Sequence, residues 1–110
     1  MPVTFLLGSQ GDTGHAEKIG ETLKEFGVPY EIIVASAHKV PEKVIAEVEK
    51  LNASKESLVV ITVVGLSNGL GGVVAGSCVH PVINCPPFKN EQEYLADIHS
   101  SLRMPSYIPV

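Results

Sequence analysis

Short apolar runs rich in β-branched residues alternate along this chain with longer segments of helical period, which restricts the folds it can adopt. The strongest run, SLVVITVV over residues 57–64, carries no charge. Such a run predicts a strand that is buried on both faces and lies near the centre of a sheet. Further strands are expected at 3–7, 30–35 and 81–85, each bounded by Gly, Pro or polar residues.

The segments between these runs follow a helical period. Ala16, Ile19, Leu23 and Phe26 recur every three or four residues, with Asp12 or Thr13 as the expected N-cap and Gly27 as the end. A second helix is expected from 41 to 52, a short glycine-rich helix around 70–74, and a longer helix from 90 to 102. Alternating strands and helices predict a parallel sheet with right-handed crossovers, hence a flavodoxin-like three-layer α/β/α sandwich.

Length and composition are consistent with one domain over residues 1–110. The chain is 45% hydrophobic and 18% charged, and its net charge of −4 without any basic cluster argues against nucleic-acid binding. Cys78 and Cys85 suggest neither a disulfide framework nor a metal site, which fits a reducing, cytoplasmic setting. No segment reaches the ~20 apolar residues that span a bilayer, so neither export nor membrane insertion is expected. Residues 106–110 are expected to enter a fifth strand that stops early.

Three strand ends carry residues suited to chemistry, and in a parallel sheet all three open on one edge. They read GSQGD at 8–12, SAHK at 36–39 and GLSNGLGG at 65–72. Glycines and the following helix N-terminus in the first loop suit a phosphate. The second loop offers a hydroxyl at Ser36, an imidazole at His38 and a cation at Lys39.

Each loop also has a plainer interpretation. The first and third could be turns that cap or closely pack a helix, and the second an exposed histidine beside a capping serine. Convergence of all three on one crevice favours a binding site with His38 as its acid or base. His15 and His99 fall in helical segments and are expected to be ordinary surface residues, whereas His80 is open to either interpretation.

Five motifs in this order resemble the aminoimidazole ribonucleotide (AIR) carboxylase, or PurE, family of purine biosynthesis. They are LLGSQGD, VASAHKVPE, SNGLGGVVAG, PVINCPP and SSLRMPS, and they extend over essentially the whole chain. Lys39 and the SNGL segment resemble the animal-type branch, which uses carbon dioxide directly. The other branch is a mutase that acts on the N5-carboxylated ribonucleotide.

The resemblance implies a lyase that carboxylates AIR to 4-carboxy-AIR, without a metal, ATP or biotin cofactor, in a homo-oligomer that is usually an octamer. His38 would transfer the proton. Ser9 and Asp12 would recognise ribose and phosphate, Ser36 and Lys39 the phosphate, and Ser67, Asn68 and Gly69 would flank carbon dioxide. The implied substrate-binding set is Gly8, Ser9, Asp12, Ser36, Ala37, Lys39, Gly65, Ser67, Asn68 and Gly69. Arg103 would close the site or join subunits.

Three departures from the family pattern stand out. Gly11 replaces a serine of the usual GSxSD loop, and Leu66 replaces an arginine of GRSN in the animal-type branch. Both changes remove a polar contact to the substrate. The chain also stops where the family continues into a fifth strand and C-terminal helices. The mutase reaction and a non-catalytic ribonucleotide-binding module are therefore the alternatives to carboxylation.

Overall fold

A computed structural model describes all residues, 1–110, and has a four-stranded, fully parallel sheet. The strands are β1 (Val3–Leu7), β2 (Tyr30–Val34), β3 (Val59–Val63) and β4 (Val82–Asn84), in the spatial order β2-β1-β3-β4. The expected parallel sheet is therefore confirmed. The SLVVITVV run supplies β3, an inner strand between β1 and β4, as its apolar composition predicts.

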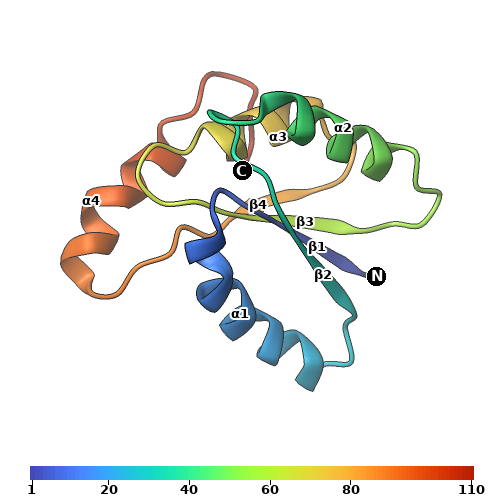
Figure 1. The fold of residues 1–110 in the computed structure, drawn as a ribbon, viewed down its shortest axis with the longest axis horizontal. Helices are drawn as coiled ribbons and strands as arrows, with labels where there is room; N and C mark the ends of the chain where they lie inside the picture. The colour runs from blue at the N-terminus through green and yellow to red at the C-terminus, as the bar shows by residue number, and fades with distance from the viewer.

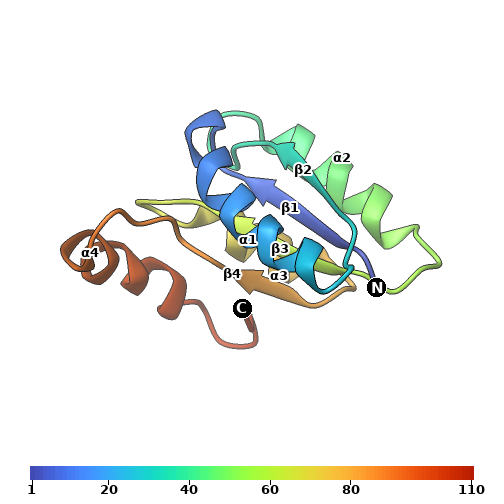
Figure 2. The same ribbon diagram turned by 90° about the horizontal axis from the view of Figure 1, so that it is seen from below.

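Helices cover the two faces of the sheet, giving the expected flavodoxin-like sandwich (Figures 1 and 2). Helix α1 (Thr13–Glu25) lies on one face, while α2 (Pro41–Asn52) and α3 (Gly69–Ser77) lie side by side on the other. Side chains of β1 alternate between the two cores: Leu6 packs in the cluster under α2 and α3, and Phe5 in the cluster under α1. This alternation follows from the two-residue period of a strand.

The ends of α1 differ in how well the sequence predicts them. Gly27 adopts φ 69° and the amide of Val28 donates to the carbonyl of Leu23 at 2.9 Å, a Schellman end that glycine favours. At the start, a short 3-10 turn over Gln10–Asp12 precedes the helix. Asp12 occupies the N-cap position, but its side chain accepts no capping hydrogen bond.

Helix α4 (Glu91–Leu102) lies beyond the carboxyl ends of the strands rather than over a face of the sheet (Figures 1 and 2). Asn90 caps it, because its side-chain oxygen accepts from the amide of Glu93 at 2.8 Å. Leu95 and Leu102 are more than half exposed. None of the four helices is long and apolar enough to cross a membrane.

The expected entry to a fifth strand at 106–110 is wrong. Tyr107 adopts φ 69° in a turn, and the amide of Ile108 donates to the carbonyl of Pro105 at 3.3 Å. Residues 108–110 pair with no strand, and Pro109 has no N–H to offer to a neighbouring strand. Ile108 instead approaches α3, where its Cδ1 would lie 3.5 Å from a Cβ added at Gly76.

Candidate active site at the carboxyl edge of the sheet

The strand register brings the three chemically distinctive loops to one edge. Leu7 pairs with both Val34 and Val63, so β1, β2 and β3 end level with one another. The segments 8–12, 35–40 and 64–68 follow these ends directly. A cavity of about 360 Å³ opens among them, and its lining residues are Gly8, Ser9, Asp12, His38, Val64, Gly65, Leu66 and Ser67.

The first loop holds two polar side chains against one another. The Ser9 hydroxyl donates to Asp12 Oδ2 at 3.3 Å, and the amide of Asp12 donates to the carbonyl of Ser9 at 3.1 Å. Gly8 lies so close to Val64 that an added Cβ would overlap the Val64 side chain. Residue 8 must therefore be a glycine, because a side chain there would push the ends of β1 and β3 apart.

The second loop divides into a structural serine and a cavity-lining histidine. The Ser36 hydroxyl accepts from the amide of Lys39 at 3.3 Å, so Ser36 caps the turn. Ala37 packs against the core under α2 and α3, and Lys39 is exposed outside the cavity lining. Only His38 of this loop lines the cavity, where its ring lies against Gly69 at the start of α3.

The third loop forms the wall opposite His38, and hydrogen bonds of its own Asn68 hold it in place. Asn68 is buried, with 6% of its surface exposed, and its side-chain oxygen accepts from the amide of Gly71 at 2.8 Å, which caps α3. The predicted turn and close packing are therefore both present. Gly65 and Ser67 line the cavity, whereas Asn68 and Gly69 do not belong to its lining. Leu66, at φ 58° and 82% exposed, stands at the mouth.

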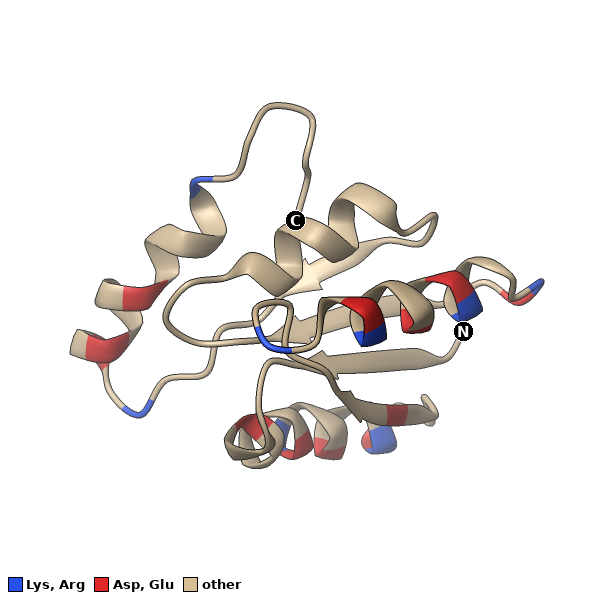
Figure 3. Cartoon of the chain, turned by 45° about the horizontal axis from the view of Figure 1, so that its top comes forward, with Lys and Arg blue, Asp and Glu red and all other residues tan.

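Charged side chains are sparse around this cavity. They lie mainly on α1, α2 and α4 and in several loops, whereas α3, which reads GLGGVVAGS, has none (Figure 3). Asp12 is the only carboxylate in the lining, and no lysine or arginine belongs to it. An anion in the cavity would therefore depend on backbone amides and hydroxyls.

The remaining histidines and cysteines lie outside the cavity. Nε2 of His80 donates to the carbonyl of Leu51 at 2.7 Å, at the opposite edge of the sheet, so that histidine secures the end of α2. His99 is exposed on α4 as expected, and His15 is partly buried on α1. Burial raises the pKa of the Cys85 thiol, which disfavours the reactive thiolate. Arg103 is exposed at the end of α4 and makes no ion pair.

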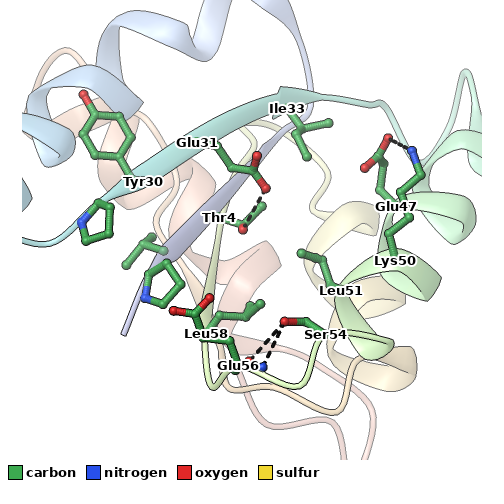
Figure 4. Close-up of a pocket in the computed structure, with 13 residues that line it drawn as sticks. Thr4, Tyr30, Glu31, Ile33, Glu47, Lys50, Leu51, Ser54, Glu56 and Leu58 are labelled. Atoms are coloured by element: carbon green, nitrogen blue, oxygen red, sulfur yellow. Dashed lines mark hydrogen bonds and ion pairs between the residues drawn. The ribbon is translucent and has the colours of Figure 1, made fainter.

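A larger cavity of about 580 Å³ lies at the opposite edge, beside Tyr30 and Leu58 (Figure 4). The carboxylates of Glu31, Glu47 and Glu56 line it, and its one cation, Lys50, is paired with Glu47 at 3.5 Å. The C-terminal end of α2 adds partial negative charge there. Such a cavity repels a phosphate, so the smaller cavity around His38 is the better candidate for a ribonucleotide.

Fold and site define a flavodoxin-like α/β domain whose candidate site lies at the carboxyl ends of its strands. The model of the AIR carboxylase family matches residues 2–110. The phosphoribosylaminoimidazole carboxylase of Treponema denticola is 45% identical over 96% of this chain, which spans 66% of that protein. The Drosophila melanogaster bifunctional phosphoribosylaminoimidazole carboxylase/succinocarboxamide synthetase is 43% identical over 94% of this chain, which spans 24% of that protein.

A solved structure agrees with these sequence matches. The crystal structure of Treponema denticola PurE superposes with a TM-score of 0.90 at 43% identity, over 97% of this chain and 67% of that chain. The chain therefore belongs to the AIR carboxylase family, as the five motifs indicate. It spans about two thirds of the bacterial relative and about a quarter of the Drosophila relative.

Proposed function

We propose that this domain carboxylates AIR at C4 with carbon dioxide to give 4-carboxy-AIR. One observation carries the proposal: His38 is the single imidazole in the cavity at the carboxyl edge of a domain of the AIR carboxylase family. Relatives that are 43–45% identical are named phosphoribosylaminoimidazole carboxylases. We propose the same activity here, as a carboxy-lyase of purine biosynthesis.

The proposed chemistry needs one proton carrier. An aminoimidazole is an electron-rich enamine whose C4 attacks the carbon of carbon dioxide, forming a carbon–carbon bond and a carboxylate. The C4 proton must then leave so that the ring regains its aromaticity, and His38 accepts it and passes it to solvent. Imidazole is the side chain most often used for such transfers. In the reverse direction, His38 returns the proton to C4 as the carboxylate departs.

The binding roles follow the family pattern and the local contacts. Ser9 and Asp12, which already share a hydrogen bond, are proposed to meet the ribose and phosphate. Ser36 and Lys39 are proposed to contribute to phosphate binding at the edge of the cavity. Ser67, which lines the cavity just before α3, is proposed to face the carboxylate, where the positive end of the helix dipole stabilises developing negative charge.

The contacts of Asn68 limit its proposed role. The oxygen and nitrogen of its side chain and its backbone amide all make hydrogen bonds within the protein. Asn68 would therefore shape the carbon dioxide pocket rather than bind substrate directly.

We also propose that the domain acts as a homo-oligomer in the cytoplasm. The exposed Leu95 and Leu102 on α4 and Ile83 on the edge strand support an assembly, because large apolar side chains in contact with water favour burial between subunits. Two unpaired cysteines are consistent with a reducing compartment. Analytical ultracentrifugation of the purified chain tests the assembly, and a monomer at all concentrations would contradict it.

Turnover with separate substrates tests the proposed reaction. Purified protein is supplied with AIR and dissolved carbon dioxide, with the N5-carboxylated ribonucleotide, or with 4-carboxy-AIR for the reverse reaction. Carboxylation of AIR and decarboxylation of 4-carboxy-AIR are expected. Preference for the N5-carboxylated ribonucleotide would show a mutase. Ribonucleotide binding in calorimetry without turnover would show the non-catalytic module that Gly11 and Leu66 suggest.

A further inference from the structure

Helix α4 meets the third loop of the site through polar side chains on one of its faces. Asp97, Ser100 and Ser101 are three and four residues apart, so they share a face of the helix. Asp97 Oδ2 would lie 3.8 Å from a Cβ added at Gly65, a residue of the cavity wall. Helix α4 therefore lies next to the loop that leads from β3 into α3, as Figure 1 shows.

Two hydrogen bonds join this face of α4 to Asn68. The amide of Asn68 donates to the Ser100 hydroxyl at 2.6 Å, and the side-chain Nδ2 of Asn68 donates to the Ser101 hydroxyl at 2.8 Å. Asn68 and Ser101 are 6% and 5% exposed, so water cannot readily replace the second bond. A buried amide that loses such a partner is left unsatisfied, which is why the pair fixes the geometry strongly.

Asn68 transmits this constraint to both sides of the loop. Before it, Gly65, Leu66 and Ser67 form one wall of the cavity. After it, Gly69 lies against His38, and an added Cβ would be 2.8 Å from Nε2 of that imidazole. Rotation of Asn68 would therefore move the wall and the surface behind the imidazole together.

From these contacts we propose that Ser100 and Ser101 are positioning residues of the candidate active site. They touch neither the cavity nor His38, and they act by fixing Asn68, which holds the wall and Gly69 in register with the imidazole. The role in catalysis rests on the proposed carboxylation. The positional coupling from α4 to His38 does not, and it can be measured in the protein without substrate.

Serine-to-alanine variants of the full chain test the proposal. Ser101→Ala and Ser100→Ala each remove one hydroxyl that holds Asn68. Ser106→Ala is the matched control, because the exposed Ser106 side chain makes no hydrogen bond. We expect kcat to fall by about 10- to 100-fold in the first two, since misplacement of reacting groups by about 1 Å has effects of that size. KM for AIR should change much less, and Ser100→Thr, which keeps a hydroxyl, should recover most of kcat.

Two measurements without substrate make the test independent of turnover. In NMR spectra, Ser101→Ala should shift the imidazole resonances of His38, and hydrogen exchange at the amide of Gly71, which donates to Asn68, should accelerate. Ser106→Ala should leave both unchanged. If wild-type protein shows no turnover but these changes occur, the carboxylase assignment fails and the positional coupling stands.

The opposite pattern overturns the proposal. In that pattern the wild type is active, and the Ser100→Ala and Ser101→Ala variants fold and keep the wild-type kcat and His38 resonances. The two serines would then only stabilise α4. If Ser101→Ala does not fold because Asn68 is left unsatisfied, Ser100→Ala decides the question alone, since Ser100 is only partly buried.

Discussion

Gly69 lies directly against the imidazole of His38. A Cβ added to this glycine would be 2.8 Å from Nε2 and 3.0 Å from Cε1 of the ring, closer than ordinary van der Waals contact. The two residues follow different strands, and Gly69 begins α3. The start of one helix therefore sets the position of the proposed proton carrier.

Gly69→Ala should displace the His38 ring and lower turnover. Alanine favours a helix over glycine by about 1 kcal/mol, so the variant should fold. We expect kcat to fall about 10-fold or more, as for other small misplacements of a catalytic group. Steady-state kinetics and thermal unfolding measure the two effects. Gly76→Ala is the control on the same helix, because its added Cβ meets Ile108 at an ordinary 3.5 Å. Equal kinetics in the two variants would contradict the contact.

Gly11→Ser should tighten ribonucleotide binding. An added Cβ at Gly11 meets only Ser9 Oγ, at 3.6 Å, so serine fits without a clash. Its hydroxyl would restore the donor of the family's GSxSD loop, and a hydrogen bond to a charged group contributes about 1.5 kcal/mol or more, roughly tenfold in Kd. Calorimetry with AIR measures the gain. Gly14→Ser, in open space in the first turn of α1, is the control. Unchanged affinity in Gly11→Ser, or the same gain in Gly14→Ser, would refute the assignment.

His15 should make stability depend on pH. Burial and the nearby Lys18 lower the pKa of His15 below its ordinary value, and Asp12 offsets this only in part. Its ring packs 5.8 Å from Phe88, measured between ring centroids. His15 lines a separate small cavity of about 320 Å³, and the charged side chains in the lining of that cavity are Asp12, Lys18, Lys89 and Glu93. The unfolded chain therefore holds the proton to higher pH than the folded chain does.

The contribution of His15 to stability is thus full above its unfolded pKa, about 6.5, and is lost as the pH falls below it. Denaturant unfolding of wild type and His15→Gln between about pH 8 and pH 5 measures the effect near that pKa. The free energy of unfolding should fall less steeply toward acid in His15→Gln. His99→Gln, on the exposed surface of α4, should behave as wild type. A steeper fall in His15→Gln than in wild type would show that the sign is wrong.

The sequence predicts the strands and the polar residues around the cavity better than the apolar residues that line it. Hydrophobic period places β1, β3 and the loops after them, because strands buried on both faces leave a clear apolar signal. Ser9, Asp12, His38 and Ser67 line the cavity as expected. Val64 lines it too, and an apolar residue beside a glycine carries no chemical signal that would identify it in advance. Leu66 also lines it, and only the comparison with the family's GRSN segment points to that position.

Contacts between distant segments explain what could not be predicted. The position of α4 depends on Ser100 and Ser101 meeting Asn68 more than thirty residues away. The motif SSLRMPS marks these serines as part of the family pattern, but periodicity gives no information about their partner. The turn at Tyr107, which replaces the expected fifth strand, likewise depends on local backbone geometry and on packing against α3.

The most direct test is the decarboxylation of 4-carboxy-AIR by wild type and His38→Asn, with ribonucleotide binding measured on the same preparations. Because His38 is proposed to return the proton to C4, the rate should fall by about 10²- to 10⁴-fold, the usual contribution of a general acid or base. The Kd should change little, and His99→Asn should match wild type. A His38→Asn variant that keeps the wild-type rate would contradict the account.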